Sequence, residues 1–97
     1  MRYEIILAPE AVQDLKQLRA SVFAVVRGAI EEHLRHEPTK TSKSRIKRLR
    51  GLAQPQYRLR VGDVRVFYDV EDGEVRVLAV VAKEDTEAWL LRKGVPS

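Results

Sequence analysis

Apolar and polar residues alternate with a period of two over residues 57–70, and only a Gly-Asp pair at 62–63 interrupts the pattern. This period is typical of strands with one buried face, and a glycine-containing pair between two such runs is typical of a hairpin turn. An Asp-Gly pair at 72–73 predicts a second turn. It leads into the almost wholly apolar segment 75–81, which we expect to be a central strand covered on both faces. The pattern therefore predicts a three-stranded antiparallel meander.

The first part of the chain has a different periodicity. Residues 2–7 form a short apolar run that predicts a strand buried on one or both faces. Apolar residues then recur at helical spacing over 11–18 and 23–34, so we expect two amphipathic helices joined tightly at a break near Ala20 and Ser21. The second should end before Pro38, because the residue before a proline avoids the helical region.

A short helix should close the chain over residues 84–92, because this segment begins with acidic residues and ends with basic ones, as the helix dipole favours. A chain of 97 residues is long enough for one hydrophobic core. We therefore expect a single α+β domain over residues 1–97. It consists of an N-terminal strand, a two-helix hairpin, a three-stranded antiparallel meander and a short C-terminal helix.

Several classes of function are disfavoured by composition. The chain has no cysteine, which removes disulfides, thiolate catalysis and cysteine zinc sites. His33 and His36 have no aligned carboxylates, so neither a metal nor another cofactor is expected. No apolar run approaches the ~20 residues that cross a membrane, and the N-terminal run is too short for a signal peptide. We expect a cytoplasmic protein without a membrane partner.

The charge distribution is strongly uneven. Between Pro38 and Gly62 the chain has no acidic residue. A cluster of cations on a small domain is typical of nucleic-acid binding, although a solvated, flexible basic loop is the alternative. Residues 39–51 contain few apolar side chains and are expected to form a loop with at most a short turn. The cations of this window are Lys40, Lys43, Arg45, Lys47, Arg48, Arg50, Arg58 and Arg60.

The predicted hairpin turn sets the register of the two strands that flank it. Arg60 should lie opposite Arg65, and Arg58 opposite Phe67, on one face of the sheet. Like charges directly across two strands are destabilising, and a bound anion would relieve that repulsion. Because guanidinium groups bind phosphate oxygens in a bidentate manner, this face is a candidate site for a nucleic-acid backbone.

Aromatic residues near this face could stack on bases, and acidic residues could neutralise its charge. Phe67 or Tyr68, and also Trp89, are candidates for stacking on a base, although most tryptophans of this kind pack in a core. Asp69 should lie across from Arg76, so we expect its carboxylate to neutralise Arg76. That pairing would leave the three predicted face arginines without an acidic partner.

The element order and three short motifs resemble the RelE/ParE superfamily of toxins from toxin-antitoxin pairs. The likeness runs over nearly the whole chain and implies a RelE-like fold and a cognate antitoxin in a hetero-oligomer. In the RelE branch it implies metal-independent cleavage of messenger RNA on the ribosome, and in the ParE branch non-nucleolytic inhibition of DNA gyrase. We take the mRNA endoribonuclease as the main interpretation, with a gyrase inhibitor or a catalytically impaired relative as alternatives. The motifs are L-R-G-L at 49–52, Y-R-L-R at 57–60 and R-V-F-Y at 65–68.

The resemblance also implies roles for individual residues. Arg65 matches the arginine that steadies the reacting phosphate, and Arg58 and Arg60 match basic residues of the neighbouring strand. RelE itself has a lysine, the proposed general base, at the position of Arg60, and arginine is a poor base. Either Lys83, Glu84 or Asp85 has taken over proton transfer, or the chain cuts weakly or not at all. The expected RNA-binding residues are Lys43, Arg45, Lys47, Arg48, Arg50, Phe67 and Trp89.

Overall fold

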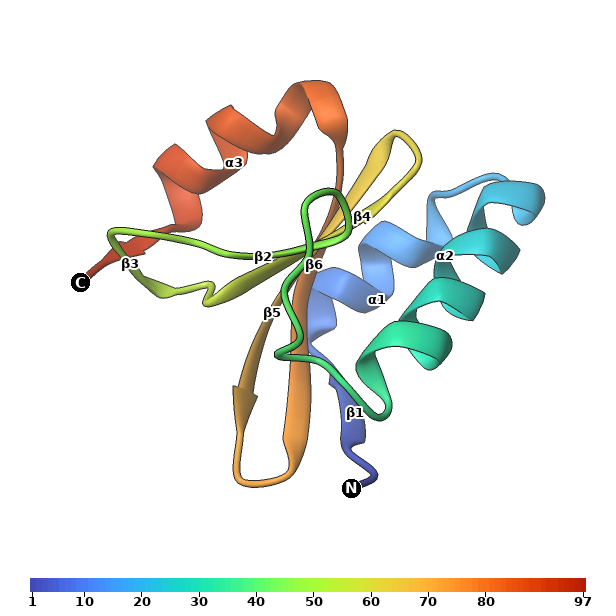
Figure 1. Cartoon of the computed structure of the whole chain (residues 1–97). Coiled ribbons are helices and arrows are strands. Elements are labelled where there is room, and N and C mark those ends of the chain that lie inside the picture. The colour runs from blue at the N-terminus through green and yellow to red at the C-terminus, as the bar shows by residue number, and fades with distance from the viewer.

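A five-stranded sheet in the order β1-β6-β5-β4-β2 forms the centre of the protein, shown in Figure 1 as a computed structural model of residues 1–97. Only β1 and β6 run parallel, and the other neighbours are antiparallel. A separate two-stranded sheet joins β3 and β7. The elements are β1 (Glu4–Leu7), α1 (Pro9–Lys16), α2 (Ala20–Leu34), β2 (Ile46–Arg48), β3 (Leu52–Gln54), β4 (Tyr57–Val61), β5 (Val64–Glu71), β6 (Glu74–Ala82), a 3-10 turn (Lys83–Asp85), α3 (Thr86–Lys93) and β7 (Val95–Pro96).

Helices α1 and α2 cover one face of the sheet, and α3 covers part of the other face (Figure 1). The alternation along β5 creates this division, because Val66 and Tyr68 face α1 and α2 whereas Phe67 faces α3. None of the helices is long and apolar enough to span a membrane. The larger core consists of Ala11, Leu15, Val26, Ile30, Leu34, Ile46, Leu59, Val66, Tyr68, Val75, Val77 and Val80.

The predicted meander is confirmed. Strand β4 turns into β5 at the expected residues, with Val61 opposite Val64. The turn between β5 and β6 has positive φ at both central residues, 50° at Asp72 and 76° at Gly73, as a type I′ hairpin turn requires. Strand β6 lies between β1 and β5, so the apolar segment near the C-terminus is the central strand that its composition predicted.

Three features differ from the expectation. The break between the first two helices lies a few residues earlier than expected, at residues 17–19, so Ala20 and Ser21 are the first two residues of α2. The basic window was expected to be a loop, but it contains β2, which pairs with β4 through Ile46 opposite Leu59. Burial of Ile46 in the larger core provides the apolar contact that stabilises this short strand. Strands β3 and β7 were not predicted at all.

A buried tyrosine fastens the segment after α2 to the sheet. The hydroxyl of Tyr68 donates a hydrogen bond of 2.6 Å to the carbonyl oxygen of Pro38, and its ring stacks on Tyr57 with 5.5 Å between the ring centroids. Burial raises the pKa of Tyr68 well above its usual value, and Tyr57 adds to this effect. The neutral hydroxyl is therefore the form that the folded state favours.

We expect Tyr68→Phe to lower the free energy of unfolding by about 1–3 kcal/mol, because the buried carbonyl of Pro38 loses its donor. The raised pKa means that this tyrosine stabilises the fold below pH ~10 and that its contribution is lost as the pH rises above that value. Between pH 9 and 11 the free energy of unfolding should therefore fall less for the variant than for the wild type, by about 1 kcal/mol. Urea unfolding across this range measures both effects, and an unchanged pH dependence would contradict the assignment.

Candidate nucleic-acid interface

Four basic side chains project from the sheet on the side away from α1 and α2, and we call them the arginine face: Lys47, Arg58, Arg60 and Arg65. Strand pairing brings them together, because Lys47 lies opposite Arg58 and Arg60 opposite Arg65. Opposed residues of antiparallel strands have Cα atoms about 4.5–5.5 Å apart. The register that the turn predicted for the three arginines is confirmed, and β2 adds Lys47 as a direct neighbour.

The arginine face carries positive charge that the protein does not neutralise. No carboxylate oxygen lies within 4.0 Å of its four cationic groups. The Nε atom of Arg58 is the one buried side-chain nitrogen or oxygen atom without a hydrogen-bond partner. Burial lowers the pKa of Arg58, and Arg65 and Arg60 lower it further by repulsion. An anion at this face would reduce that repulsion.

Arg65 is held in place by the turn that precedes its strand. The side chain is 8% exposed, and its Nη1 donates to the carbonyl oxygens of Gly62 at 2.8 Å and Val64 at 3.1 Å. Backbone carbonyls hold a guanidinium without neutralising it, because they carry only partial charge. The cation therefore has a fixed position and keeps its full charge.

Lys83 and Glu84 follow the end of β6 and lie next to the same hairpin turn. The backbone amide of Lys83 donates to the carbonyl oxygen of Asp63 at 2.8 Å, which ties the start of the 3-10 turn to the hairpin. Both side chains are exposed and neither forms an ion pair. The fold thus places a lysine and a carboxylate at the end of the sheet where Arg60 faces Arg65.

The expected role of Asp69 is wrong. Asp69 does lie across from Arg76, but its carboxylate accepts hydrogen bonds from Gln54 Nε2 at 2.7 Å and from the backbone amide of Gln56 at 2.8 Å. Arg76 instead pairs with Glu74 at 3.1 Å. Asp69 organises the chain that leads into β4, where unpaired polar backbone groups need a partner.

Phe67 and Trp89 stack on each other with 4.8 Å between the ring centroids and 7° between the planes. With Ala79 they form a second core beneath α3, where Phe67 is 1% exposed and Trp89 is 8% exposed. These rings were expected to stack on RNA bases. With α3 in this position the two rings pack against each other and are covered by protein. The sequence pattern does not reveal this contact between β5 and α3.

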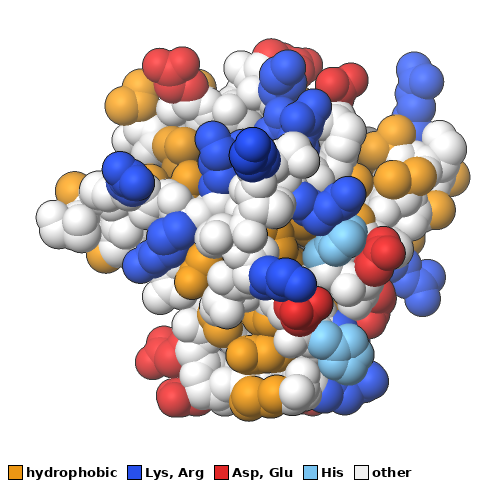
Figure 2. Space-filling model, viewed as in Figure 1, with side chains coloured by type: hydrophobic (Ala, Val, Ile, Leu, Met, Phe, Trp, Pro, Cys, Tyr) orange, Lys and Arg blue, Asp and Glu red, His pale blue; other side chains and the backbone are white.

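The basic window presents its side chains along the edge strand β2 and the segment before it. Arg48 lies over the ring of Tyr57, with its guanidinium carbon 5.2 Å from the centroid, and Arg45 Nη1 is 3.1 Å from His33 Nε2. Figure 2 shows Lys and Arg side chains spread over this face, with few acidic ones between them. The exposed cations of the window that were predicted to bind RNA are Lys43, Arg45, Lys47, Arg48 and Arg50.

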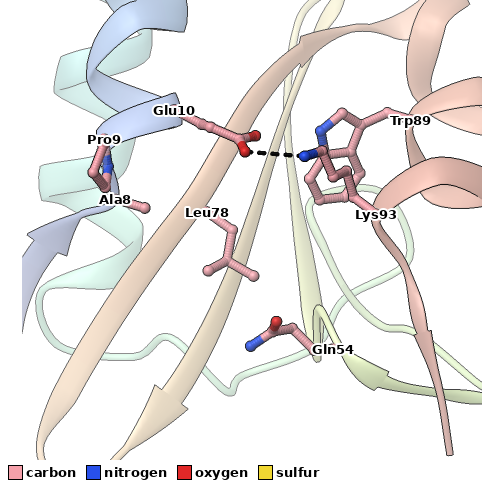
Figure 3. A pocket seen from close by; sticks show the side chains of 7 residues that line it. All are labelled: Ala8, Pro9, Glu10, Gln54, Leu78, Trp89 and Lys93. Atoms are coloured by element: carbon pink, nitrogen blue, oxygen red, sulfur yellow. Dashed lines mark hydrogen bonds and ion pairs between the residues drawn. The ribbon is translucent and has the colours of Figure 1, made fainter.

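A cavity of about 290 Å³ lies between the start of α1 and α3 (Figure 3). Leu78 and Trp89 contribute apolar surface to its lining, and Glu10 and Lys93, which also line it, form an ion pair of 3.2 Å. This ion pair connects α1 to the end of α3. In no part of the structure do three His, Cys, Asp or Glu side chains gather as ligands of a metal ion.

The profile of the ParE toxin of the type II toxin-antitoxin system parDE matches residues 5–86. The chain belongs to the ParE toxin family. This ParE-family toxin has the RelE-like fold and lies within the RelE/ParE superfamily, as its motifs predicted. No curated protein matches its sequence at a significant level.

Solved structures of toxin-antitoxin complexes are similar to the ParE-family toxin. A chain of the archaeal RelE-RelB complex from Pyrococcus horikoshii OT3 matches with a TM-score of 0.69 and 26% identity, over 86% of this chain and 97% of that one. A chain of the RelBE2 complex from Mycobacterium tuberculosis matches with a TM-score of 0.66 and 25% identity, over 84% and 99%. A chain of the RelB-RelE complex from Methanococcus jannaschii has a TM-score of 0.67 and 23% identity, over 87% and 96%.

Proposed function

We propose that this toxin inhibits translation by cleaving messenger RNA on the ribosome in the cytoplasm. The observation that carries the proposal is the arginine face, whose cations lack carboxylate partners and whose Arg58 Nε is buried without a hydrogen bond. A phosphodiester supplies the oxygens that such a face lacks. The similar complexes of RelE with RelB support a cognate antitoxin that neutralises this toxin in a hetero-oligomer.

In the proposed reaction, the ribose 2′-oxygen attacks the adjacent phosphorus, and the bond from phosphorus to the 5′-oxygen of the next nucleotide breaks. Arg65 stabilises the charge that develops on the phosphoryl oxygens, while Arg58 and Arg60 hold the backbone. One group takes the 2′-hydroxyl proton and another protonates the leaving 5′-oxygen. Glu84 is the carboxylate and Lys83 the ammonium group that lie at this end of the sheet.

A translation extract programmed with a single message tests the proposal. The toxin should cut the message only when ribosomes translate it, and primer extension should map the cuts within the reading frame. The purified antitoxin should abolish them. An intact message in an extract whose protein synthesis the toxin blocks would contradict cleavage as the mechanism.

Inhibition of DNA gyrase without cleavage is the second candidate, and two observations favour it. The profile that matches the chain is that of ParE toxins. The position of Arg60 offers a guanidinium, which cannot act as a general base near neutral pH. A supercoiling assay with purified gyrase separates the candidates, because only this second one predicts a loss of supercoiling at toxin concentrations that leave messages intact.

Message cleavage should persist after transition metals are removed. The structure gathers no set of side chains that would hold a catalytic ion. We expect less than a ~2-fold change in the cleavage rate when extract and toxin are treated with a chelator selective for zinc and other transition metals, with magnesium kept for the ribosome. Restoration by one added transition metal, lost again in His33→Ala or His36→Ala, would contradict this expectation.

A further inference from the structure

Strand β1 forms an open edge of the sheet. Glu4 and Ala8 donate their amides inward, to the carbonyl oxygens of Gly73 and Val77. The odd-numbered residues Tyr3, Ile5 and Leu7 therefore point their amides and carbonyls outward. Of these, Tyr3 is already used, because its amide donates to Arg35 O at 2.7 Å and its carbonyl accepts from Arg35 Nη1 at 3.0 Å.

Ile5 and Leu7 are the remaining outward residues of β1. Helix α1 begins at Pro9 and Arg35 occupies the other end, so the free edge is about three residues long. Leu7 is 39% exposed and Ile6 37% exposed, so the free part of this edge strand, residues 5–7, is apolar, uncharged and in contact with solvent. Such an edge is a template for pairing with another extended chain unless something covers it.

An apolar groove runs beside this edge and is lined by residues of β1, α1 and α2; Figure 1 shows both helices on the same side of the sheet. Its volume is about 300 Å³, enough for one bulky side chain of a strand paired with β1. The groove therefore combines backbone donors and acceptors with a side-chain pocket. Its apolar lining consists of Ile5, Leu7, Leu15, Phe23 and Ile30.

The rim of the groove is positively charged. Glu31 and Arg35 form a two-pronged ion pair with distances of 2.6 and 3.0 Å, and this pair neutralises itself. Arg27 also lines the groove and has no acidic side chain within 4.0 Å. Hydrogen bonding from Arg35 lowers the pKa of Glu31, and the fields of Arg2 and Arg27 add to that effect. A ligand with a carboxylate near Arg27 would complement this rim.

We propose that β1 binds an extended segment of the antitoxin as a sixth strand, with a bulky apolar side chain in the groove and an acidic residue at Arg27. The inference rests on the antitoxin partner proposed above and names where that partner docks. In the strand order β1 lies at the opposite edge of the sheet from β2. This docking strand therefore leaves the arginine face uncovered, and neutralisation of that face needs a different part of the antitoxin.

Amide hydrogen exchange by NMR on the toxin with the small protein encoded beside its gene tests the docking strand. The amides of Ile5 and Leu7 should exchange at least ~10-fold more slowly in the complex than in the free toxin, because they become paired. The amide of Ile6 points inward to β6 by the same alternation, so it serves as the internal control. Unchanged exchange at Ile5 and Leu7 in a formed complex, or failure of the two proteins to bind, would overturn the proposal.

A charge reversal tests the acidic contact. Arg27→Glu should weaken antitoxin binding by about 10-fold, which corresponds to ~1.4 kcal/mol. Arg19→Glu is the matched control, because Arg19 is exposed just before α2 and does not line the groove. Equal affinities of the two variants would overturn the contact. These measurements use binding alone, so absence of message cleavage would contradict the proposed function without affecting the result for β1.

Discussion

Replacement of Arg65 by alanine should slow message cleavage by about 100- to 1,000-fold and remove growth inhibition. The reason is that a preorganised charged donor to a developing oxyanion contributes on the order of 2.7–4 kcal/mol to a transition state. In this protein the preorganisation is visible, since Gly62 and Val64 hold the guanidinium through their carbonyls. Primer extension in the translation extract and colony counts after induction measure the two effects.

Controls must separate lost chemistry from lost structure, because Arg65 is also part of the hairpin. Arg76→Ala is a matched variant, since Arg76 is exposed on the neighbouring strand and pairs only with Glu74. It should cleave at the wild-type rate. Both variants should bind the antitoxin as the wild type does. A soluble Arg65→Ala protein with full toxicity would show that the assigned site is wrong.

Replacement of Trp89 by alanine should lower the free energy of unfolding by about 3–5 kcal/mol, which is a large part of the 5–15 kcal/mol typical of a small domain. Trp89 is the one fully packed side chain of α3, and its stack on Phe67 is the main apolar contact between this helix and the sheet. The ion pair of Lys93 with Glu10 is exposed and contributes at most ~1 kcal/mol. Urea denaturation of the two proteins gives the difference.

Leu91 provides the comparison within the same helix. It is 83% exposed, so Leu91→Ala should change the free energy of unfolding by less than ~0.5 kcal/mol. If Trp89→Ala costs no more than this control, α3 is not held by the aromatic stack. A large loss with an unchanged affinity for RNA would show further that the two rings serve packing and not base stacking.

Local patterns in the sequence were sufficient to predict the meander and the opposition of Arg60 and Arg65. A two-residue turn and strict alternation determine the register over the next few residues without reference to the rest of the chain. The central position of β6 was equally predictable, because a strand with few polar residues must be covered on both faces. These are features that depend on neighbours in sequence.

The missed features depend on neighbours in space. Strand β2 is three residues long and has one buried side chain, Ile46, which is too little for a periodic signal. Strands β3 and β7 pair across more than 40 residues, with Leu52 opposite Pro96. The carboxylate of Asp69 accepts a hydrogen bond from the backbone amide of Gln56, and it does not pair with the cross-strand arginine that we expected. Distant pairings of this kind leave no local pattern.

The parallel pairing of β1 with β6 has a consequence for newly made toxin. Glu4 lies opposite Glu74, and Leu7 lies opposite Val77, so the first strand of the chain to leave the ribosome has no partner until the last quarter has followed. Helices α1 and α2 emerge with their apolar faces bare, because Val66 and Val75 arrive later. Until β6 arrives, both edges of β1 are unpaired and can bind another extended chain. Pairing of β1 with another chain can therefore begin before the molecule has completed the sheet that carries its cations.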